Sequence, residues 1–299
     1  MIGLTRREFV ALVASSLFTP RAVGDAATPS PIIMRPIPHS GERLPAVGLG
    51  TASVFDRDTE ETRRSAAAVV HTLLDGGARL IDTASTYADA ELVLGKVLAA
   101  EGVRDRIFIA TKLEEPDEAE LERSLTRLRT RKLDLLQLHN VRDPRQSLAQ
   151  FFAWKRQGIC RYVGITSTYH SDFDAVLAVL KREKPDFVQI DYSIDNRLVE
   201  ARILPLAADV GAAVLTALPF GRGRLFRTVR DKPIPDWAQP FAGSWAVFFL
   251  KYLLGDERVT AVIPGTTSAA HMADNLGAMR GPLPDQAQRK RMVSFIASL

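Results

Sequence analysis

The sequence has a single cysteine, no concentrated basic stretch and no long apolar run. Cys160 is the only cysteine among the 299 residues, so no disulfide can form within the chain. It opens the apolar run 160–165, and we interpret it as a buried strand residue rather than a nucleophile. The formal charge of +4 is spread along the chain without clustered Lys, Arg and aromatic residues, which predicts no nucleic-acid partner.

The first residues of the chain have the pattern of an export signal. Arg6 and Arg7 stand near the start, an apolar run extends over residues 10–18, and small residues follow. This order is typical of a secretory signal, and the Arg pair resembles the twin-arginine type, which addresses a folded protein to the export machinery. The run is too short to span a bilayer, so we expect no stable membrane anchor. The alternative is an ordinary amphipathic N-terminus of a cytosolic protein.

These features predict three segments. We expect residues 1–26 to be a signal peptide that is removed on export to the periplasm or beyond, residues 27–31 to be a linker, and residues 32–299 to form one domain. At 46% hydrophobic residues the chain is apolar enough for one large α/β domain. The domain opens with a predicted hairpin. The first helix after it is expected to begin at Asp58, where Glu61 completes a capping-box pattern.

Short apolar runs then alternate with segments of helical periodicity. The strand candidates are 46–50, 80–81, 107–110, 133–138, 161–165, 187–190, 213–218 and 259–263. Alternation of this kind predicts a parallel sheet, and eight units in about 250 residues predict a (β/α)8 TIM barrel of the α/β class, here with an extra C-terminal helix near 285–298. A doubly wound open sheet is the alternative, although Gly48 and Gly50 supply only two glycines of its dinucleotide-binding fingerprint.

Three successive predicted strands end on ionisable residues. Asp82, Lys112 and His139 close the runs that begin at 80, 107 and 133, and Tyr87 lies in the loop after Asp82. The carboxyl ends of the strands of a parallel barrel meet on one rim, where active sites of this fold are found. These four residues are therefore our candidate catalytic set.

A phenol, an ammonium group, a carboxylate and an imidazole suit proton transfer to an oxygen that gains negative charge. Lys112 would make Tyr87 a better proton donor, and Asp82 would hold Lys112 charged and in place. His139 would hydrogen-bond a carbonyl oxygen. The sequence has no serine elbow, Cys/His pair or metal-binding pattern, so we expect no metal ion, and carbonyl reduction with hydride from a nicotinamide is the predicted chemistry. Taken singly, each residue has a structural alternative as a helix cap, a solvated strand end, a core histidine or a packing residue.

The motifs around these residues resemble those of the aldo-keto reductase family. The similarity is carried by GARLIDTASTY at 77–87, IATK at 109–112, LDLLQLH at 133–139, VQIDYS at 188–193 and VIPGT at 262–266. It covers about residues 32–280. The resemblance implies a (β/α)8 barrel, NADPH or NADH bound across the rim, Tyr87 as the proton donor and a small aldehyde or ketone as the substrate.

The same resemblance implies where the cofactor would lie. The positions implied to contact it are Gly50, Thr51, Thr166, Ser167, Gln189, Pro219, Gly221, Arg222, Gly265, Thr266, His271 and Asn275. Thr166 and Ser167 replace a Ser-Asn pair that usually holds the carboxamide. Gly265 and His271 replace basic residues often found near the adenosine phosphate. The choice between NADPH and NADH therefore stays open, with the loop of Arg222 and Arg224 as an alternative source of donors to a 2′-phosphate.

Aromatic residues are the candidates for the walls of the site. Ala217 stands where the family commonly has a tyrosine that stacks on the nicotinamide, so Phe220 or another aromatic residue would have to supply that face. The substrate candidates are Val54, Phe55, Trp237 and Phe241, which imply a substrate with an apolar body.

Two other functions remain open on the sequence. The first is a non-catalytic barrel of the same fold that binds a nucleotide or a partner, which the thinned cofactor contacts favour. The second is an isomerase or lyase that uses Tyr87 as a base. Turnover of a nicotinamide that is lost in Tyr87→Phe would separate a reductase from both.

Overall fold

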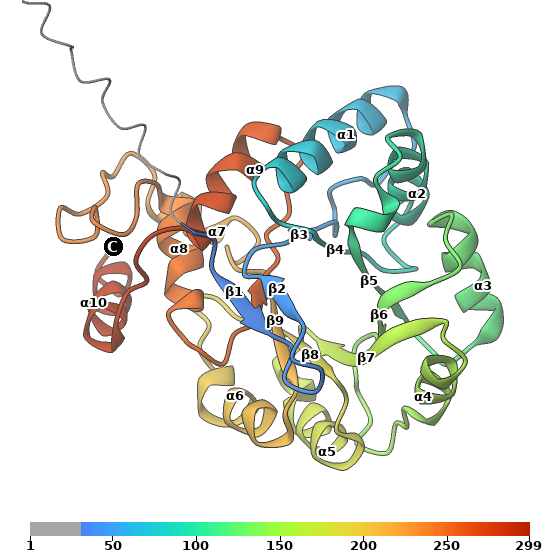
Figure 1. Ribbon diagram of the computed structural model, residues 1–299. Helices are drawn as coiled ribbons and strands as arrows, with labels where there is room; N and C mark the ends of the chain where they lie inside the picture. Colours follow the sequence, from blue (N-terminus) through green and yellow to red (C-terminus); the bar gives the residue numbers. More distant parts are fainter. Residues whose placement is uncertain (1–30) are drawn as a thin grey trace, which may run out of the picture. The chain divides into compact units, whose positions relative to one another are not determined.

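Eight parallel strands form the centre of the structure (Figure 1). The computed structural model describes residues 31–299, so the expected signal peptide and all but the last residue of the expected linker lie outside the described residues. The strands are β3 (Leu49–Gly50), β4 (Leu80–Asp82), β5 (Phe108–Leu113), β6 (Leu133–Leu138), β7 (Cys160–Ser167), β8 (Phe187–Asp191), β9 (Ala213–Ala217) and β10 (Ala261–Val262). Each pairs with the next, and parallel bridges Val47–Val262 and Gly50–Gly265 join the first strand to the last. The sheet therefore closes on itself, which confirms the predicted (β/α)8 barrel.

Helices surround the strands (Figure 1). They are α1 (Glu60–Asp75), α2 (Ala90–Ala100), α3 (Glu118–Arg127), α4 (Ala149–Arg156), α5 (Phe173–Glu183), α6 (Val199–Val210), α7 (Arg224–Thr228), α8 (Trp245–Leu254), α9 (Ala269–Leu276) and the extra C-terminal α10 (Gln286–Ala297). The short α7 has no counterpart in the sequence prediction. No helix within residues 31–299 is long and apolar enough to cross a membrane.

The start of α1 corrects one local prediction. The N-cap is Thr59, whose side chain accepts a hydrogen bond from the backbone N–H of Thr62. The carboxylate of Asp58 instead forms ion pairs with Arg63 and Lys96. A short acidic side chain suits an N-cap, but two nearby cations hold Asp58 away from that role.

The predicted hairpin consists of β1 (Met34–Pro36) and β2 (Arg43–Pro45) and crosses in front of the barrel in Figure 1. It contributes buried side chains to a cluster inside the barrel, whose members are Ile37, Leu44, Leu80, Phe108, Ala110, Leu135, Tyr162, Phe187, Ala213, Leu215, Ala261 and Ile263. Side chains alternate along a strand, so the next inward positions toward the carboxyl ends lie directly above this cluster. The apolar cluster is thus the floor of the candidate site.

Candidate active site

The structure brings the four predicted catalytic residues together. Asp82 ends β4, Lys112 lies near the end of β5, and His139 directly follows β6, where its N–H donates to the carbonyl oxygen of Leu113 over 2.8 Å. Tyr87 lies in the loop between β4 and α2, and its ring packs edge-to-face on that of His139 with the centroids 5.8 Å apart. The prediction that neighbouring strand ends would gather these side chains agrees with this geometry.

Lys112 is the centre of the group. Its Nζ donates to a carboxylate oxygen of Asp82 over 2.6 Å and to the carbonyl oxygen of Thr83 over 2.7 Å. The same Nζ lies 4.9 Å from the centroid of the Tyr87 ring. Burial by itself lowers the pKa of Lys112, but the Asp82 carboxylate and the Tyr87 hydroxyl raise it above its usual value. The amine therefore stays protonated beside the phenol.

Two buried amides complete the surroundings of Asp82. Gln189 donates from Nε2 to Asp82 over 3.2 Å, and Gln137 donates from Nε2 to Asp82 over 3.4 Å and to Oε1 of Gln189 over 2.9 Å. Burial raises the pKa of Asp82, while Lys112 and these amides oppose that effect. Gln137 is a site residue that sequence reasoning missed. Its signal was its position, since it stands two residues before His139 on the same face of the strand.

The imidazole of His139 is held neutral. Burial, the positive charge of Lys112 and that of Arg142 lower the pKa of His139 to about 3. Its Nδ1 lies 2.5 Å from a carboxylate oxygen of Glu114. Glu114 is the second residue that sequence reasoning missed, although it directly follows β5 and stands two positions after Lys112.

The cofactor candidates lie at the ends of five other strands of the same rim or in the adjoining loops. Gly50 and Gly265 face each other across the bridge that closes the barrel, and a Cβ on Gly50 would lie 2.7 Å from the carbonyl oxygen of Ile263. Thr266 and Asn275 are buried, and His271 is exposed on the first turn of α9. The closed barrel thus places these five residues on one side of the rim.

The candidates for the carboxamide are already hydrogen-bonded within the protein. Ser167 is fully buried and donates to Asp172 over 3.3 Å. Thr51, a cofactor candidate that was not assigned to the carboxamide, donates to the carbonyl oxygen of Asp82 over 3.0 Å. The hydroxyl oxygen of Thr166 accepts from the N–H of Asn140 over 3.1 Å. The amide of Gln189 serves Asp82 and Gln137, as described above. These hydrogen bonds hold the strand ends in place.

The loop after β9 carries the next group of candidates. Pro219 is buried and Gly221 adopts a φ of +54°, which a side chain at that position would strain. Arg222 is exposed. Phe220 packs on Phe226, with the centroids 4.8 Å apart, so its ring is engaged by a neighbouring helix.

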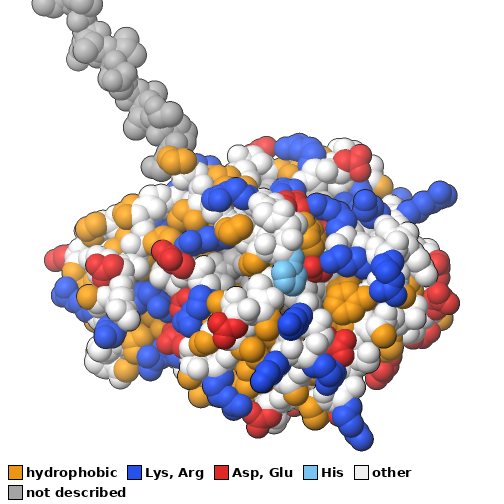
Figure 2. Space-filling view, turned by 60° about the horizontal axis from the view of Figure 1, so that its bottom comes forward, with side chains coloured by type: hydrophobic (Ala, Val, Ile, Leu, Met, Phe, Trp, Pro, Cys, Tyr) orange, Lys and Arg blue, Asp and Glu red, His pale blue; other side chains and the backbone are white. Residues whose placement is uncertain are grey.

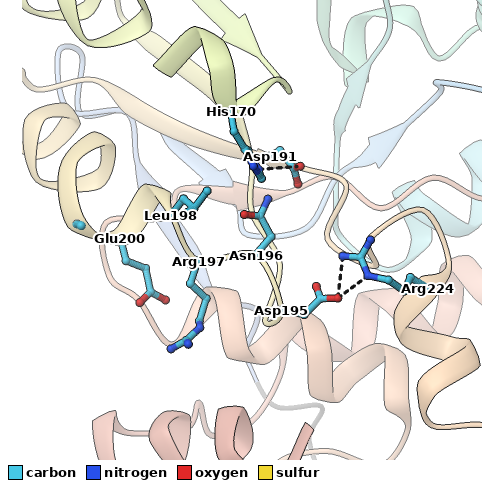
Figure 3. Close-up of a pocket in the computed structure, with 9 residues that line it drawn as sticks. His170, Asp191, Asp195, Asn196, Arg197, Leu198, Glu200 and Arg224 are labelled. Carbon is cyan, nitrogen blue, oxygen red and sulfur yellow. Dashed lines mark hydrogen bonds and ion pairs between the residues drawn. The ribbon is translucent and has the colours of Figure 1, made fainter. Parts of the chain in front are cut away.

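An open pocket of about 890 Å³ lies beyond the ends of β7, β8 and β9 (Figure 3). Figure 3 shows His170 directed toward Asp191, at 3.8 Å, and Arg224 bound to Asp195, at 2.7 Å. Arg224, one of the two arginines considered for a 2′-phosphate, is thus held by a carboxylate. Figure 2 shows one face of the molecule, on which Lys and Arg side chains are interspersed with Asp and Glu.

The apolar substrate candidates are only partly placed at the rim. Phe55 is fully buried within the core between strands and helices, so the expectation that it forms a wall of the site is wrong. Trp237 packs on Phe241 and on Phe248 of α8 and Phe295 of α10, and Phe241 is itself buried. Packing against the two outer helices thus occupies the ring of Trp237. Val54 lies beside Gly265, at the closing seam of the barrel.

No group of three or more His, Cys, Asp or Glu side chains within residues 31–299 is arranged to hold a metal ion. Comparison with known proteins agrees with the fold. The family model "Aldo/keto reductase family" matches residues 46–294. The chain therefore belongs to the aldo/keto reductase family, and as a member it is an NAD(P)H-dependent oxidoreductase.

Two sequence relatives and one solved structure are similar to this chain over most of their length. The 6-dehydroglucose reductase of Novosphingobium aromaticivorans is 29% identical over 84% of this chain and 92% of its own length. An uncharacterized oxidoreductase of Bacillus subtilis, YrpG, is 30% identical over 62% of this chain and 66% of its own length, just under two thirds. An aldo-keto reductase from Klebsiella pneumoniae, solved in complex with NADPH, superposes with a TM-score of 0.69 at 22% identity and covers 89% of this chain and 96% of its own. The similarity to the Klebsiella structure, at 22% identity, shows a shared fold.

Proposed function

We propose that this protein reduces a small aldehyde or ketone to an alcohol, with hydride from NADPH or NADH and with Tyr87 as the proton donor. The observation that carries the proposal is the row of Asp82, Lys112 and Tyr87, in which the first two side chains are buried and the third is half-buried. Lys112 is 2.6 Å from a carboxylate oxygen on one side and 4.9 Å from the phenol ring centroid on the other.

Each residue of the row has a defined part in proton transfer. A bound nicotinamide would supply the hydride for the carbonyl carbon. The carbonyl oxygen then gains negative charge and takes a proton from the hydroxyl of Tyr87. The ammonium group of Lys112 stabilises the phenolate that remains, and Asp82 keeps that ammonium group charged in a site from which water is excluded.

The rim has donors and space that fit a dinucleotide. Gly265 is exposed, and a Cβ there would lie 3.1 Å from both the carbonyl oxygen of Gly50 and a methyl group of Val54, so glycine keeps this seam open. Helix α9 begins four residues later, and helix N-termini attract phosphate groups. Arg222 adds an exposed guanidinium. The NADPH of the Klebsiella relative supports the same cofactor class here.

Cofactor titration and one substitution test the proposal. Protein that begins near Ala27 is titrated with NADPH and with NADH by nicotinamide fluorescence, and turnover is followed with small aldehydes. Tyr87→Phe should bind the cofactor as tightly as the wild type and lose about 10²- to 10⁴-fold in kcat. Tyr169→Phe, at an exposed tyrosine, is the matched control and should keep full activity.

A non-catalytic nucleotide-binding barrel is the second candidate. The engaged amide of Gln189 and the small Ala217 favour it, because both reduce the contacts available to a nicotinamide. Tight binding of NADPH or NADH without turnover of any aldehyde, in the wild type as in Tyr87→Phe, would support this function over the reductase.

We also propose that residues 1–26 direct export by the twin-arginine route, so that the enzyme acts in the periplasm or outside the cell. The support is the Arg6-Arg7 pair followed by a short apolar run. Replacing both arginines with lysine should leave the protein in the cytoplasm at its full length. Normal processing of that variant would contradict the route.

A further inference from the structure

One face of helix α3 is joined to the loop that carries Tyr87, through residues that the proton-transfer argument does not use. Glu120, Ser124 and Arg127 stand at positions i, i+4 and i+7, so they share this face. Glu120 is buried, with 8% of its surface exposed, and Ser124 is fully buried. The side chains at the two ends of this face, Glu120 and Arg127, both form hydrogen bonds to the loop between β4 and α2.

The carboxylate of Glu120 joins two loops of the rim. Its Oε1 accepts from Oγ of Ser85 over 2.5 Å, and Ser85 stands two residues before Tyr87. The same oxygen accepts from the N–H of Glu114 over 3.2 Å, and Oε2 accepts from the N–H of Glu115 over 3.4 Å. An ionised carboxylate has acceptor sites on both oxygens for these three donors. Glu120 thus ties the loop after β4 to the loop after β5.

Arg127 holds the same loop on the other side of Tyr87. Its Nη1 donates to the carbonyl oxygen of Ala88 over 3.3 Å. Ala88 has a φ of +41°, in the left-handed region that residues other than glycine rarely adopt. Gly95 of α2 lies so close to the end of α3 that a Cβ there would be 2.0 Å from the carbonyl oxygen of Arg127. The backbone that carries Arg127 is therefore fixed, and its bond to Ala88 opposes relaxation of the strained turn.

The loop between the two anchored residues transmits their position to the phenol. The N–H of Tyr87 donates to the carbonyl oxygen of Ala84 over 3.1 Å, and the carbonyl oxygen of Tyr87 accepts from the N–H of Ala90 over 2.8 Å. These bonds make residues 84–90 a continuous turn. A shift of either anchored residue therefore moves the phenol relative to Lys112, and a misplacement of about 1 Å can cost about 10²-fold in rate.

We propose that Glu120 and Arg127 are positioning residues for Tyr87, so that the face of α3 that they share sets how well the phenol is placed to donate its proton. Both act through the loop between β4 and α2, and neither touches the reacting atoms. The inference rests on carbonyl reduction as the proposed function and deepens it, because it assigns part of the rate to residues outside the candidate catalytic set.

The kinetics of α3 variants test the proposal. Proton donation by Tyr87 occurs in the transition state, so Glu120→Ala should lower kcat about 10- to 100-fold and leave the Kd of the cofactor and the KM of a small aldehyde unchanged. Arg127→Met, which removes one hydrogen bond, should lower kcat about three- to tenfold. Glu122→Ala and Arg123→Ala, at exposed positions of the same helix, are the matched controls and should keep full activity.

Two further comparisons separate positioning from a merely structural role. Glu120→Gln keeps an oxygen that can accept from Ser85 and from the N–H of Glu114, so its kcat should lie between those of the wild type and Glu120→Ala. In the Tyr87→Phe background, Glu120→Ala should have no further effect on kcat, because the group that it positions is absent. An equal loss of kcat in both backgrounds would overturn the proposal, as would a rise in KM at unchanged kcat.

The position of Tyr87 can also be followed without turnover. The chain has only 5 tyrosines, so labelling with 3-fluorotyrosine gives a simple ¹⁹F NMR spectrum, in which Tyr87→Phe identifies the signal of Tyr87 by its disappearance. Because the ring lies 4.9 Å from the charged Nζ of Lys112, Glu120→Ala should shift this signal, whereas Glu122→Ala should leave it in place. An unmoved signal in Glu120→Ala would refute the positioning role and leave the reductase standing. A shifted signal, in a protein whose folded wild type reduces no carbonyl compound, would refute the proposed function while α3 would still position Tyr87.

Discussion

Gly164 leaves room for the side chain of Gln137 inside the barrel, and its replacement by alanine should disturb the candidate site from below. An added Cβ would lie 2.9 Å from Cγ and 3.1 Å from Oε1 of Gln137, and 3.1 Å from Cβ of Phe187. Gln137 is fully buried, so it can yield only by moving its amide away from Gln189 and Asp82. We expect Gly164→Ala to lower the free energy of unfolding by about 1–3 kcal/mol, the usual range for overpacking, and to lower kcat.

A double variant tests whether the added methyl group acts through Gln137. Gln137→Ala alone leaves the buried Oε1 of Gln189 without a donor and should cost about 1–3 kcal/mol. The double variant should lose about 1–2 kcal/mol less free energy of unfolding than the two single variants lose together, because the clash and the displaced amide disappear together. Urea unfolding of the four proteins measures this coupling, provided that their m-values agree. Additive effects within about 0.5 kcal/mol would refute the reasoning and leave the contact with Phe187 as the cause.

Burial lowers the pKa of Lys251, which donates to two backbone carbonyl oxygens, to about 8 from its usual 10.5. Between these values the unfolded chain binds more protons, so the stability of the wild type relative to Lys251→Met should rise with pH, by up to roughly 3 kcal/mol between urea titrations at pH 7.5 and pH 10. Burial raises the pKa of Glu42, but hydrogen bonds from Tyr162 and two arginines outweigh it and hold that pKa below the usual 4.5. Glu42→Gln should therefore cost about 1–3 kcal/mol in the free energy of unfolding at pH 7, and the loss should fade as the pH falls below 4.5 in the same titrations. Since the pKa of His139 is about 3, its NMR signals should not shift between pH 5 and pH 8, and a midpoint in that range would contradict its desolvation.

The barrel and the clustering of the candidate catalytic set (Asp82, Tyr87, Lys112 and His139) were predictable because both follow from local sequence patterns. Apolar runs that alternate with helical segments define the strands, and parallel strands bring their carboxyl ends to one rim. Asp82, Lys112 and His139 end three such runs, so their proximity required no knowledge of side-chain contacts. Gln137 and Glu114 were within reach of the same reasoning, since each lies two residues from a predicted site residue.

Other parts of the site could not be predicted because they depend on the conformation of loops. Phe55 stands in a loop, and the sequence does not tell whether a loop aromatic faces the site or fills the core. Trp237 likewise packs on α8 and α10, contacts that join segments far apart in the chain. The ion pair that holds Arg224 depends on how the loop after β8 meets the start of α7. Each of these outcomes is set by tertiary packing, on which residue spacing carries no information.

The geometry of the candidate site depends on residues outside the motifs that predicted Asp82, Tyr87, Lys112 and His139. A buried ion pair such as Asp82 and Lys112 is stable only when its remaining hydrogen-bonding groups are satisfied, because both charges have lost their water. The amides of Gln137 and Gln189 and the carbonyl oxygen of Thr83 supply those bonds here. A sequence that kept all four motif residues but replaced both glutamines with apolar side chains would leave the carboxylate of Asp82 under-solvated. Its pKa would rise further, Lys112 would lose its counter-charge, and Tyr87, the proposed proton donor, would lose its charged neighbour.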